Sequence, residues 1–440
     1  MRRLQFMAAF AGLALVAGTP AEARKKAPPP PPAPVIPQVR TGDAGIDAWY
    51  FYDRHGAPLW TASDAGRQAA ARVIEVLKRA PIDGLAEGPV LAATVEAALA
   101  AGTLDGDAAI STAWMKYVRT VKAPVAGIEY GDPALTLKVP TPKEALGALA
   151  AAPSMATAVD ATARVNAFYA SLRETALDTG SQADPHVKAT LERLRAVPDR
   201  GKLILVDTAS QRLMMIEDGT VVGTMKVVVG KAHSPTHNIA GTINYVTLNP
   251  YWNIPLDIVK RRVAPLVIKR GSAYLTAARY VTTERWGVAA ERVDPDSIDW
   301  KAVAAGDKTA YLRQMPGPNN MMGKMKFGFV NSGDIFLHDT PRKALFDKPK
   351  RNLSNGCVRL EKASELARWI TGTEPVVGDD APEQQVRIMG GIPVYTLALT
   401  AFAGSDGKIA FADDVYGYDD PATAAHAGAA LTQPVADDGN

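Results

Sequence analysis

Residues 202–230 read KLILVDTASQRLMMIEDGTVVGTMKVVVG, and this stretch decides the fold because the period of the hydrophobic pattern changes there. Apolar and β-branched residues gather in short runs, which predict strands over Leu203–Val206, Gln211–Ile216 and Val221–Val229. Between the last two runs, Glu217-Asp218-Gly219-Thr220 contains the Asp-Gly pair of a tight hairpin turn. We therefore expect a β-rich domain to begin near residue 198.

Strand-like runs continue downstream in the segments TINYVTL, KFGFV, DIFLHD, PVYTLALTAF and IAFADDVYG. We expect these runs to complete an antiparallel sheet within a domain over 198–420. Residues from about 252 to 315 show no regular period and contain Pro and Arg, so we expect an irregular flap over the sheet. Residues 421–440 are small and polar, which predicts a disordered tail.

Upstream, residues 41–197 are rich in alanine and follow the helical period. In SDAGRQAAARVIEVLKRA we expect Asp64 as the N-cap, with apolar residues on one broad face; DAAISTAWMKYVRTV and VNAFYASLRETALDT show the same pattern. The aromatic segment WYFYDRHGAPLW (49–60) is too dense in rings to face water, so it predicts packing between helices. The sequence thus indicates an α+β protein in which a helical scaffold domain precedes the β-rich one.

The first 23 residues have the pattern of an export signal: a basic MRR, an apolar FMAAFAGLALVAG and a small-x-small AEA ending at Ala23. The apolar run is shorter than the roughly 20 residues of a membrane-spanning helix, so we expect cleavage after Ala23, with a retained anchor as the alternative. Residues 24–40 form a Pro-rich linker. We therefore expect an exported protein of the periplasm or cell envelope, with no stable membrane span after cleavage. A net charge of +3 lacks the basic footprint of nucleic-acid-binding proteins.

Cys357 in RNLSNGCVRL (351–360) is the only cysteine of the chain. Structural cysteines of exported proteins come in pairs, so Cys357 is either a small buried hydrophobe or a reactive thiol. Its small and polar neighbours favour the reactive thiol. A thiol nucleophile needs a base, and His338 ends the predicted strand DIFLHD, from which an imidazole can face a cleft. The pair would act as a thiolate and an imidazolium.

Other residues of this segment suit acyl transfer. Gly356 lets a substrate carbonyl approach the backbone, and the N–H groups of Gly356 and Cys357 can stabilise an oxyanion. Arg359 either holds the loop or binds a substrate carboxylate, and Ser354 bonds either the imidazole or the backbone turn. Alternatively, Arg359 and Ser354 only form the hydrogen bonds of an ordinary loop.

The second ring nitrogen of His338 needs an orienting partner. Asp339 is a candidate through its carboxylate, but adjacent strand residues point to opposite faces, so a backbone carbonyl is an equal alternative. His233 and His237 in HSPTH have the i, i+4 spacing of metal ligands on helices. Pro235 argues against a helix there and no further ligand lies nearby, so we expect no metal site and no cofactor.

The segment HDTPRKALFDKPKRNLSNGCVR resembles the signature of the L,D-transpeptidase (YkuD) family, in which His is followed by S-x-G-C-x-R. FYDRHGAPLW, NPYWNIPLDIV, LRQMPGPNNMMGKMKFGFVN and DGKIAFADDVYGYD are similar to the large YcbB-like branch of that family. The resemblance implies that Cys357 is the nucleophile, His338 the general base and Arg359 the motif arginine. It also implies a catalytic domain over 198–420, with a capping flap at about 252–315.

The same resemblance suggests further site residues. Trp252, Phe336 and His237 are candidates for lining the substrate groove. Asn355 stands where many members of the family have His, which leaves the substrate preference open. The peptidoglycan-binding repeat that is usual in this branch has no room between the helical and the β-rich segments.

The resemblance implies a peptidoglycan tetrapeptide stem as the substrate. Cys357 would attack the carbonyl of the third residue and release D-alanine, and an amine of a second stem would resolve the thioester to give a 3→3 cross-link. Carbapenem-type β-lactams would acylate the same cysteine. The alternatives are resolution by water, as in an L,D-carboxypeptidase or cross-link hydrolase, and a non-catalytic scaffold that binds the envelope.

Overall fold

The computed structural model describes residues 57–287, 289–373 and 381–423, together with residues 48, 51, 52, 55 and 375. The predicted signal peptide, the Pro-rich linker and residues 424–440 of the predicted tail lie outside these ranges. None of the helices in the described ranges is long and apolar enough to cross a membrane.

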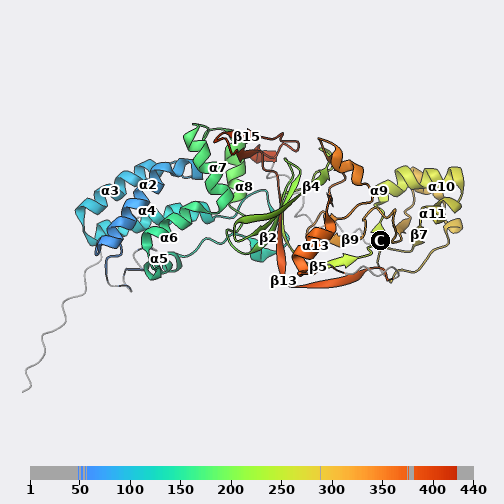
Figure 1. Ribbon diagram of the computed structural model, residues 1–440, viewed down its shortest axis with the longest axis horizontal. Helices are drawn as coiled ribbons and strands as arrows, with labels where there is room; N and C mark the ends of the chain where they lie inside the picture. Colours follow the sequence, from blue (N-terminus) through green and yellow to red (C-terminus); the bar gives the residue numbers. More distant parts are fainter. Residues whose placement is uncertain are drawn as a thin grey trace, which may run out of the picture. The chain divides into compact units, whose positions relative to one another are not determined.

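The first helix whose bounds lie in the described ranges is α2 (Asp64–Arg79), and its cap lies one residue earlier than expected. The Ser63 hydroxyl oxygen accepts a hydrogen bond from the Gly66 N–H at 3.0 Å, so Ser63 is the N-cap and Asp64 is the first residue of the helix. The expectation of Asp64 as N-cap was therefore wrong. The α-helices that follow are labelled in Figure 1: α3 (Gly88–Ala101), α4 (Leu104–Lys122), α5 (Pro142–Ala151), α6 (Met155–Arg164), α7 (Ala167–Asp178) and α8 (Pro185–Leu194). Two short 3-10 helices, η1 (Ala80–Asp83) and η2 (Pro133–Leu135), lie between α2 and α5.

The described residues of the aromatic segment 49–60 pack against α4, whereas its residues 49, 50, 53, 54 and 56 lie outside the described ranges. Trp60 is fully buried, and its Nε1 donates to Ser111 Oγ at 2.7 Å. The Tyr52 hydroxyl donates to Asp107 Oδ1 at 2.6 Å, so the polar ends of both rings are satisfied inside the helical core. The core prediction is confirmed for Phe51, Tyr52 and Trp60.

The predicted meander forms strands β2 (Lys202–Asp207), β3 (Arg212–Glu217) and β4 (Thr220–Gly230). Asp218 and Gly219 have φ of 46° and 76°, which gives the left-handed turn that suits the twist of a hairpin. The other elements of this region are β1 (Glu129–Tyr130), β5 (Ile239–Leu248), β9 (Met325–Phe327), β10 (Leu337–His338), η5 (Lys343–Asp347), β11 (Asn352–Ser354), β12 (Val358–Leu360), α13 (Ala363–Thr371), β13 (Gln384–Leu397), β14 (Ala401–Ala403) and β15 (Ile409–Phe411).

The main sheet has the order β1-β5-β13-β2-β3-β4-β12-β10-β9, with β11 on β4. It is mixed rather than antiparallel, because β13 pairs parallel with β2 and β10 pairs parallel with β12. Parallel neighbours need a long connection, and a local hydrophobic pattern does not show which distant strands will pair.

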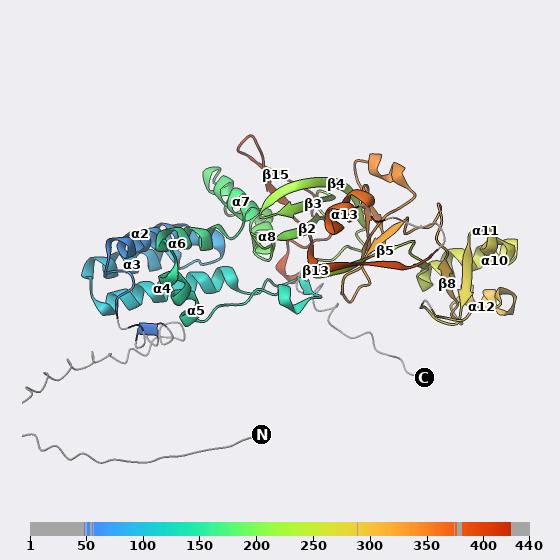
Figure 2. The same cartoon turned by 60° about the horizontal axis from the view of Figure 1, so that its bottom comes forward.

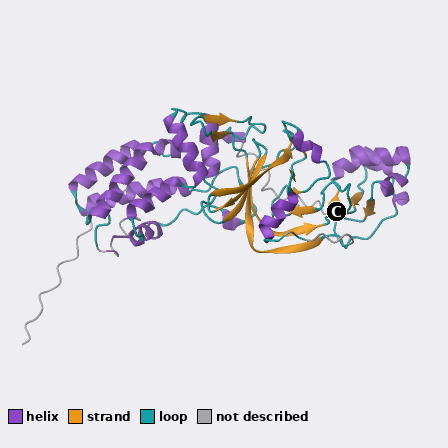
Figure 3. Ribbon diagram, viewed as in Figure 1, coloured by secondary structure: helices purple, strands orange, loops and turns teal. Residues whose placement is uncertain are grey.

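Both faces of this sheet are buried. On one face, Ile204 and Val206 of β2 share a core with Leu366 of α13. On the other face, Leu203 and Leu205 share a core with helices α7 and α8, which lie beside the strands in Figures 1 and 3. The alternation along β2 follows from the two-residue period of a strand.

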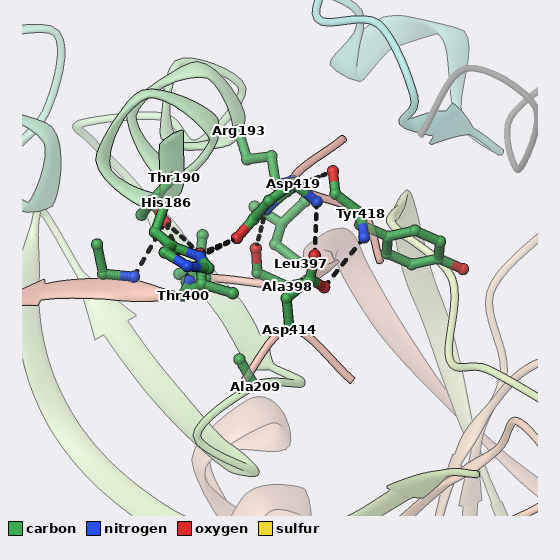
Figure 4. Close-up of polar contacts among 12 residues, drawn as sticks. His186, Thr190, Arg193, Ala209, Leu397, Ala398, Thr400, Asp414, Tyr418 and Asp419 are labelled. Carbon is green, nitrogen blue, oxygen red and sulfur yellow. Dashed lines mark hydrogen bonds and ion pairs between the residues drawn. The ribbon is translucent and has the colours of Figure 1, made fainter. Parts of the chain in front are cut away.

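Helix α8 also fixes the segment that follows β15. Arg193 donates to Asp419 Oδ1 at 2.7 Å and to the Ala398 carbonyl at 2.6 Å (Figure 4). Asp419 Oδ2 accepts from Thr400 Oγ1 at 2.7 Å and lies 2.5 Å from His186 Nδ1. The Arg193 and Asp419 side chains are only 5% and 8% exposed, so this is a buried ion pair with most of its polar atoms satisfied.

The expected flap is not irregular. It contains a small sheet of order β6-β8-β7, made of β6 (Trp252–Asn253), β7 (Tyr280–Thr283) and β8 (Tyr311–Gln314), part of which is labelled in Figure 2. Its helices are α9 (Leu256–Ile258), η3 (Val259–Val263), α10 (Ala264–Arg270), α11 (Ala273–Ala277), η4 (Pro295–Ser297) and α12 (Trp300–Ala305). Ile254, Leu275 and Leu312 belong to its own core. Each element is too short to show a clear period in the sequence.

Candidate functional site

A cavity of about 440 Å³ contains the sequence-predicted cysteine, histidine and arginine together. Cys357, His338 and Arg359 line it, with Ser354, Asn355 and Phe336. From the flap side it is lined by Tyr251, Trp252, Asn253, Pro255, Ile258 and Trp286. The volume is typical of a pocket for a small molecule or a short peptide segment.

The register of two strands brings the motif together. Strands β10 and β12 are parallel neighbours that pair Leu337 with Val358 and His338 with Arg359. Leu337 and Val358 are fully buried on the core side. Because side chains alternate along a strand, His338, Arg359 and the preceding Cys357 project from the opposite face into the cavity.

The turn before Cys357 requires glycine. Gly356 has φ of 112°, a conformation that other residues adopt only with strain, and an added Cβ would lie 3.4 Å from the Pro235 carbonyl oxygen. The Gly356 N–H donates to Ser354 Oγ at 3.2 Å. Ser354 therefore bonds the backbone turn, one of the two partners that the sequence left open for it.

Thr236 holds the same turn from the loop after β4. Its Oγ1 donates to the Gly356 carbonyl at 2.5 Å and accepts the Gly230 N–H at 2.9 Å. Thr236 is fully buried. Sequence reasoning missed this residue, because nothing in HSPTH shows that its threonine reaches a residue more than a hundred positions later.

The tautomer of His338 follows from its partner. Nδ1 lies 2.6 Å from the Asp339 carbonyl oxygen, and a carbonyl only accepts, so Nδ1 carries the proton. In the neutral ring Nε2 is then an acceptor. The Asp339 carboxylate accepts the Lys324 N–H at 2.9 Å and pairs with Lys343 at 2.8 Å. The backbone carbonyl, and not the carboxylate of Asp339, therefore orients the imidazole.

Burial opposes charge on both members of the pair. It lowers the pKa of His338 to about 4, and the nearby guanidinium of Arg359 and ammonium of Lys326 act in the same direction. Burial raises the pKa of the Cys357 thiol, although the Phe336 N–H and the same two cations oppose this shift. Both shifts favour a neutral thiol and a neutral imidazole in the free site.

Arg359 presents an uncompensated charge to the cavity. Its Nε is buried without a hydrogen-bond partner in the described part of the chain, and burial lowers the pKa of its guanidinium. Asn355 is exposed at the rim, where its Oδ1 accepts from Lys231 Nζ at 3.2 Å. Arg359 therefore offers a guanidinium to an anionic group that enters the cavity.

Two of the three groove candidates lie at the cavity. Trp252 and Phe336 line it, whereas His237 is not among its lining residues. Instead, His237 Nδ1 lies 2.8 Å from the Tyr418 hydroxyl, and burial lowers the pKa of its ring. The expectation for His237 is corrected, because its ring is held by the segment after β15.

Sequence reasoning also missed several lining residues. Lys326, Asp334 and Trp286 line the cavity, and the Asp334 carbonyl oxygen lies 3.6 Å from Cys357 Sγ. Trp286 and Lys326 carry no motif, so only the folded chain places them. In the described ranges, no group of three or more His, Cys, Asp or Glu residues is arranged to hold a metal ion.

Comparison with known proteins gives two family matches. Residues 201–382 match the L,D-transpeptidase catalytic domain, YkuD, and residues 48–175 match the Scaffold domain. A Haemophilus influenzae protein named "Putative L,D-transpeptidase" is 31% identical over 235 residues, which are 52% of this chain and 47% of that protein. The chain thus spans about half the length of this curated relative.

Two solved structures show weak similarity. The L,D-transpeptidase from Mycobacterium smegmatis has 13% identity and a TM-score of 0.23, over 45% of this chain and 58% of that one. The Ldtfm-avibactam carbamoyl enzyme has 13% identity and a TM-score of 0.22, over 46% of this chain and 51% of that one. TM-scores this low support no statement about this chain. The two family matches identify its domains. Residues 201–382, whose side chains line the cavity with Cys357, belong to the YkuD family of L,D-transpeptidase catalytic domains, and a Scaffold domain precedes them.

Proposed function

We propose that the protein is an exported peptidoglycan L,D-transpeptidase that works through a thioester on Cys357. The observation that carries this proposal is the pairing of β10 with β12, which gathers Cys357, His338 and Arg359 in one cavity of a YkuD domain. The substrate is a peptidoglycan stem tetrapeptide, as the family membership suggests.

The first half-reaction forms the acyl-enzyme. Nε2 of His338 takes the thiol proton as Cys357 Sγ attacks the carbonyl carbon of the third residue, and the oxygen of that carbonyl becomes an oxyanion. The Gly356 N–H already bonds Ser354, so we expect the Cys357 N–H to stabilise the oxyanion. The C–N bond then breaks, the imidazolium of His338 gives its proton to the leaving amine, and D-alanine departs.

The second half-reaction resolves the thioester. A neutral side-chain amine of a second stem attacks the thioester carbonyl, and His338 takes the proton that the amine loses. The C–S bond breaks, the thiolate leaves, and the imidazolium returns the proton to sulfur. The new amide is a 3→3 cross-link, and the enzyme returns to its neutral pair.

The resting neutral pair has a consequence for this mechanism. Because the pKa of Cys357 is raised and that of His338 is lowered, the ion pair forms only as the thiol attacks. A bound substrate that excludes water and brings a negative charge near Lys326 and Arg359 would stabilise the imidazolium. We therefore expect the thiol to react faster with its substrate than with a neutral alkylating agent.

Incubation of the purified protein with a tetrapeptide stem, with product analysis by mass spectrometry, tests the function. Transpeptidation predicts free D-alanine and cross-linked dimers, and Cys357→Ala abolishes both. A tripeptide without dimers indicates an L,D-carboxypeptidase, and no reaction with a folded protein favours the non-catalytic scaffold. We also expect a carbapenem to acylate Cys357 and to block product formation.

A further inference from the structure

A lysine to which the proposed mechanism assigns no substrate contact lies beside the catalytic pair. Strand β9 is antiparallel to β10 and pairs Lys326 with His338, while β12 pairs Arg359 with His338 on the other side. Residues in register on adjacent strands project from the same face of a sheet. Lys326, His338 and Arg359 therefore form one row across the cavity floor, and all of them line the cavity.

The ammonium of Lys326 is held at the cavity by an aromatic ring. Its Nζ lies 4.1 Å from the centroid of the Phe336 ring. Phe336 immediately precedes β10, and its backbone carbonyl accepts the N–H of Val358, the residue after Cys357. The cation–π contact thus keeps a positive charge near the nucleophile.

Neither cation of this row has a carboxylate partner. In the described part of the chain, Lys326 and Arg359 form no ion pair, and Arg359 Nε has no hydrogen-bond partner at all. Asp334 is the one acidic side chain among the described lining residues, and it pairs with neither. Two positive charges without an ion-pair partner in the described part of the chain, on either side of the imidazole, favour the binding of an anion.

The proposed donor carries suitable anions. Its leaving residue has a terminal carboxylate, which lies two bonds from the amine nitrogen that departs. A diamino acid at the third position can carry a second free carboxylate on its side chain. The terminal carboxylate carbon lies three bonds from the reacting carbonyl carbon, and the side-chain carboxylate lies at the end of a flexible chain, so either can reach a cation that flanks His338.

We propose that Lys326 is a specificity-determining residue, which binds a carboxylate of the donor stem on the side of His338 opposite to Arg359. This inference rests on the proposed function. Lys326 would select stems with a free carboxylate near the scissile bond over stems in which that carboxylate is an amide. Arg359 would bind another anionic group of the substrate or stabilise the oxyanion.

The test uses three donor stems and four proteins. The stems are the free tetrapeptide, the same peptide with its terminal carboxylate amidated, and one with the third-residue side-chain carboxylate amidated. The proteins are wild type, Lys326→Met, Lys326→Arg and the control Lys324→Met. Lys324 is exposed and does not line the cavity. The readout is kcat/KM for release of the fourth residue.

A lost charged hydrogen bond predicts that Lys326→Met lowers kcat/KM for the free stem by roughly 10- to 100-fold. The same substitution should have little effect on whichever amidated stem lacks the recognised carboxylate, and this stem identifies the source of the anion. Lys326→Arg keeps the charge and should recover most of the rate, and Lys324→Met should match wild type.

Two results would overturn the inference while leaving the function intact. One is a Lys326→Met enzyme as fast as wild type on the free stem. The other is an equal loss on all three stems with no recovery in Lys326→Arg, which would indicate a structural role. If wild type releases the fourth residue from none of the stems, the proposed function fails and the role of Lys326 fails with it.

Discussion

Thr236→Val tests how the nucleophile turn is held. The substitution keeps the shape of the side chain but removes the hydroxyl that joins the Gly230 N–H to the Gly356 carbonyl. Both glycines and Thr236 itself are buried, so water does not readily replace the lost bonds. Thr236→Ser is the matched control, because it keeps the hydroxyl and loses only a methyl group.

The expected loss of stability in Thr236→Val follows from two hydrogen bonds. The two hydrogen bonds have lengths of 2.9 and 2.5 Å, and each leaves one buried backbone group without its partner when the hydroxyl is removed. An unsatisfied buried polar group costs about 1–3 kcal/mol, so Thr236→Val should lower the free energy of unfolding by roughly 2–4 kcal/mol. Thr236→Ser should cost about 1 kcal/mol, for the lost methyl group.

Two assays read the result. Urea unfolding followed by fluorescence gives the change in stability, and the rate of iodoacetamide alkylation reports the exposure of Cys357, the only cysteine of the chain. We expect Thr236→Val to be alkylated faster, because the turn that holds the half-buried thiol is released. A Thr236→Val protein within about 0.5 kcal/mol of wild type, or a Thr236→Ser protein that is equally destabilised, would refute this reasoning.

Three further predictions follow from the same structure. Gly356→Ala should lose acyl-enzyme formation in a mass-spectrometric assay, because a φ of 112° disfavours a side chain by about 1–2 kcal/mol. The control is Gly372→Ala, where φ is 80° and the space around the residue is open. It should lose a similar amount of stability and still form the acyl-enzyme. The pKa of His338, about 4 in the folded protein, lies below its unfolded value, so the unfolded chain binds the proton first as pH falls. The free energy of unfolding of wild type should therefore fall by up to about 3 kcal/mol between pH 6.5 and 4, relative to that of His338→Asn. A difference between the two proteins that does not change with pH would contradict the burial of the imidazole. Arg193→Met leaves the Asp419 carboxylate buried without its cation, so it should lower the free energy of unfolding by about 3–5 kcal/mol in urea. Adding Asp419→Asn should recover part of this loss. Strictly additive effects of the two substitutions would argue against a coupled ion pair.

Local features of this protein were predictable from its sequence. The Asp218-Gly219 turn and its flanking strands follow from the two-residue period and from the turn chemistry. The pairing of Cys357 with His338 in one cavity was predictable because both residues lie in a contiguous motif segment. The need for glycine at 356 was also expected, although the structure gives a backbone reason for it in addition to substrate access.

Features that depend on pairing between distant segments were not predictable. Lys326 faces His338 only because β9 pairs with β10 in one particular register, which the sequence KFGFV does not specify. The parallel pairing of β13 with β2 has the same origin. His237 has its partner in Tyr418, which lies beyond the last strand, so no local pattern could exclude it from the groove.

Detection of the acyl-enzyme decides whether Cys357 is the nucleophile. The mature protein is mixed with a tetrapeptide stem, quenched in acid within seconds and analysed by intact and peptide mass spectrometry. The thioester mechanism predicts an added mass equal to the stem minus its terminal D-alanine, located on Cys357 and absent from Cys357→Ala. A folded protein whose thiol is alkylated by iodoacetamide, but which gains no such mass and releases no D-alanine, would contradict it.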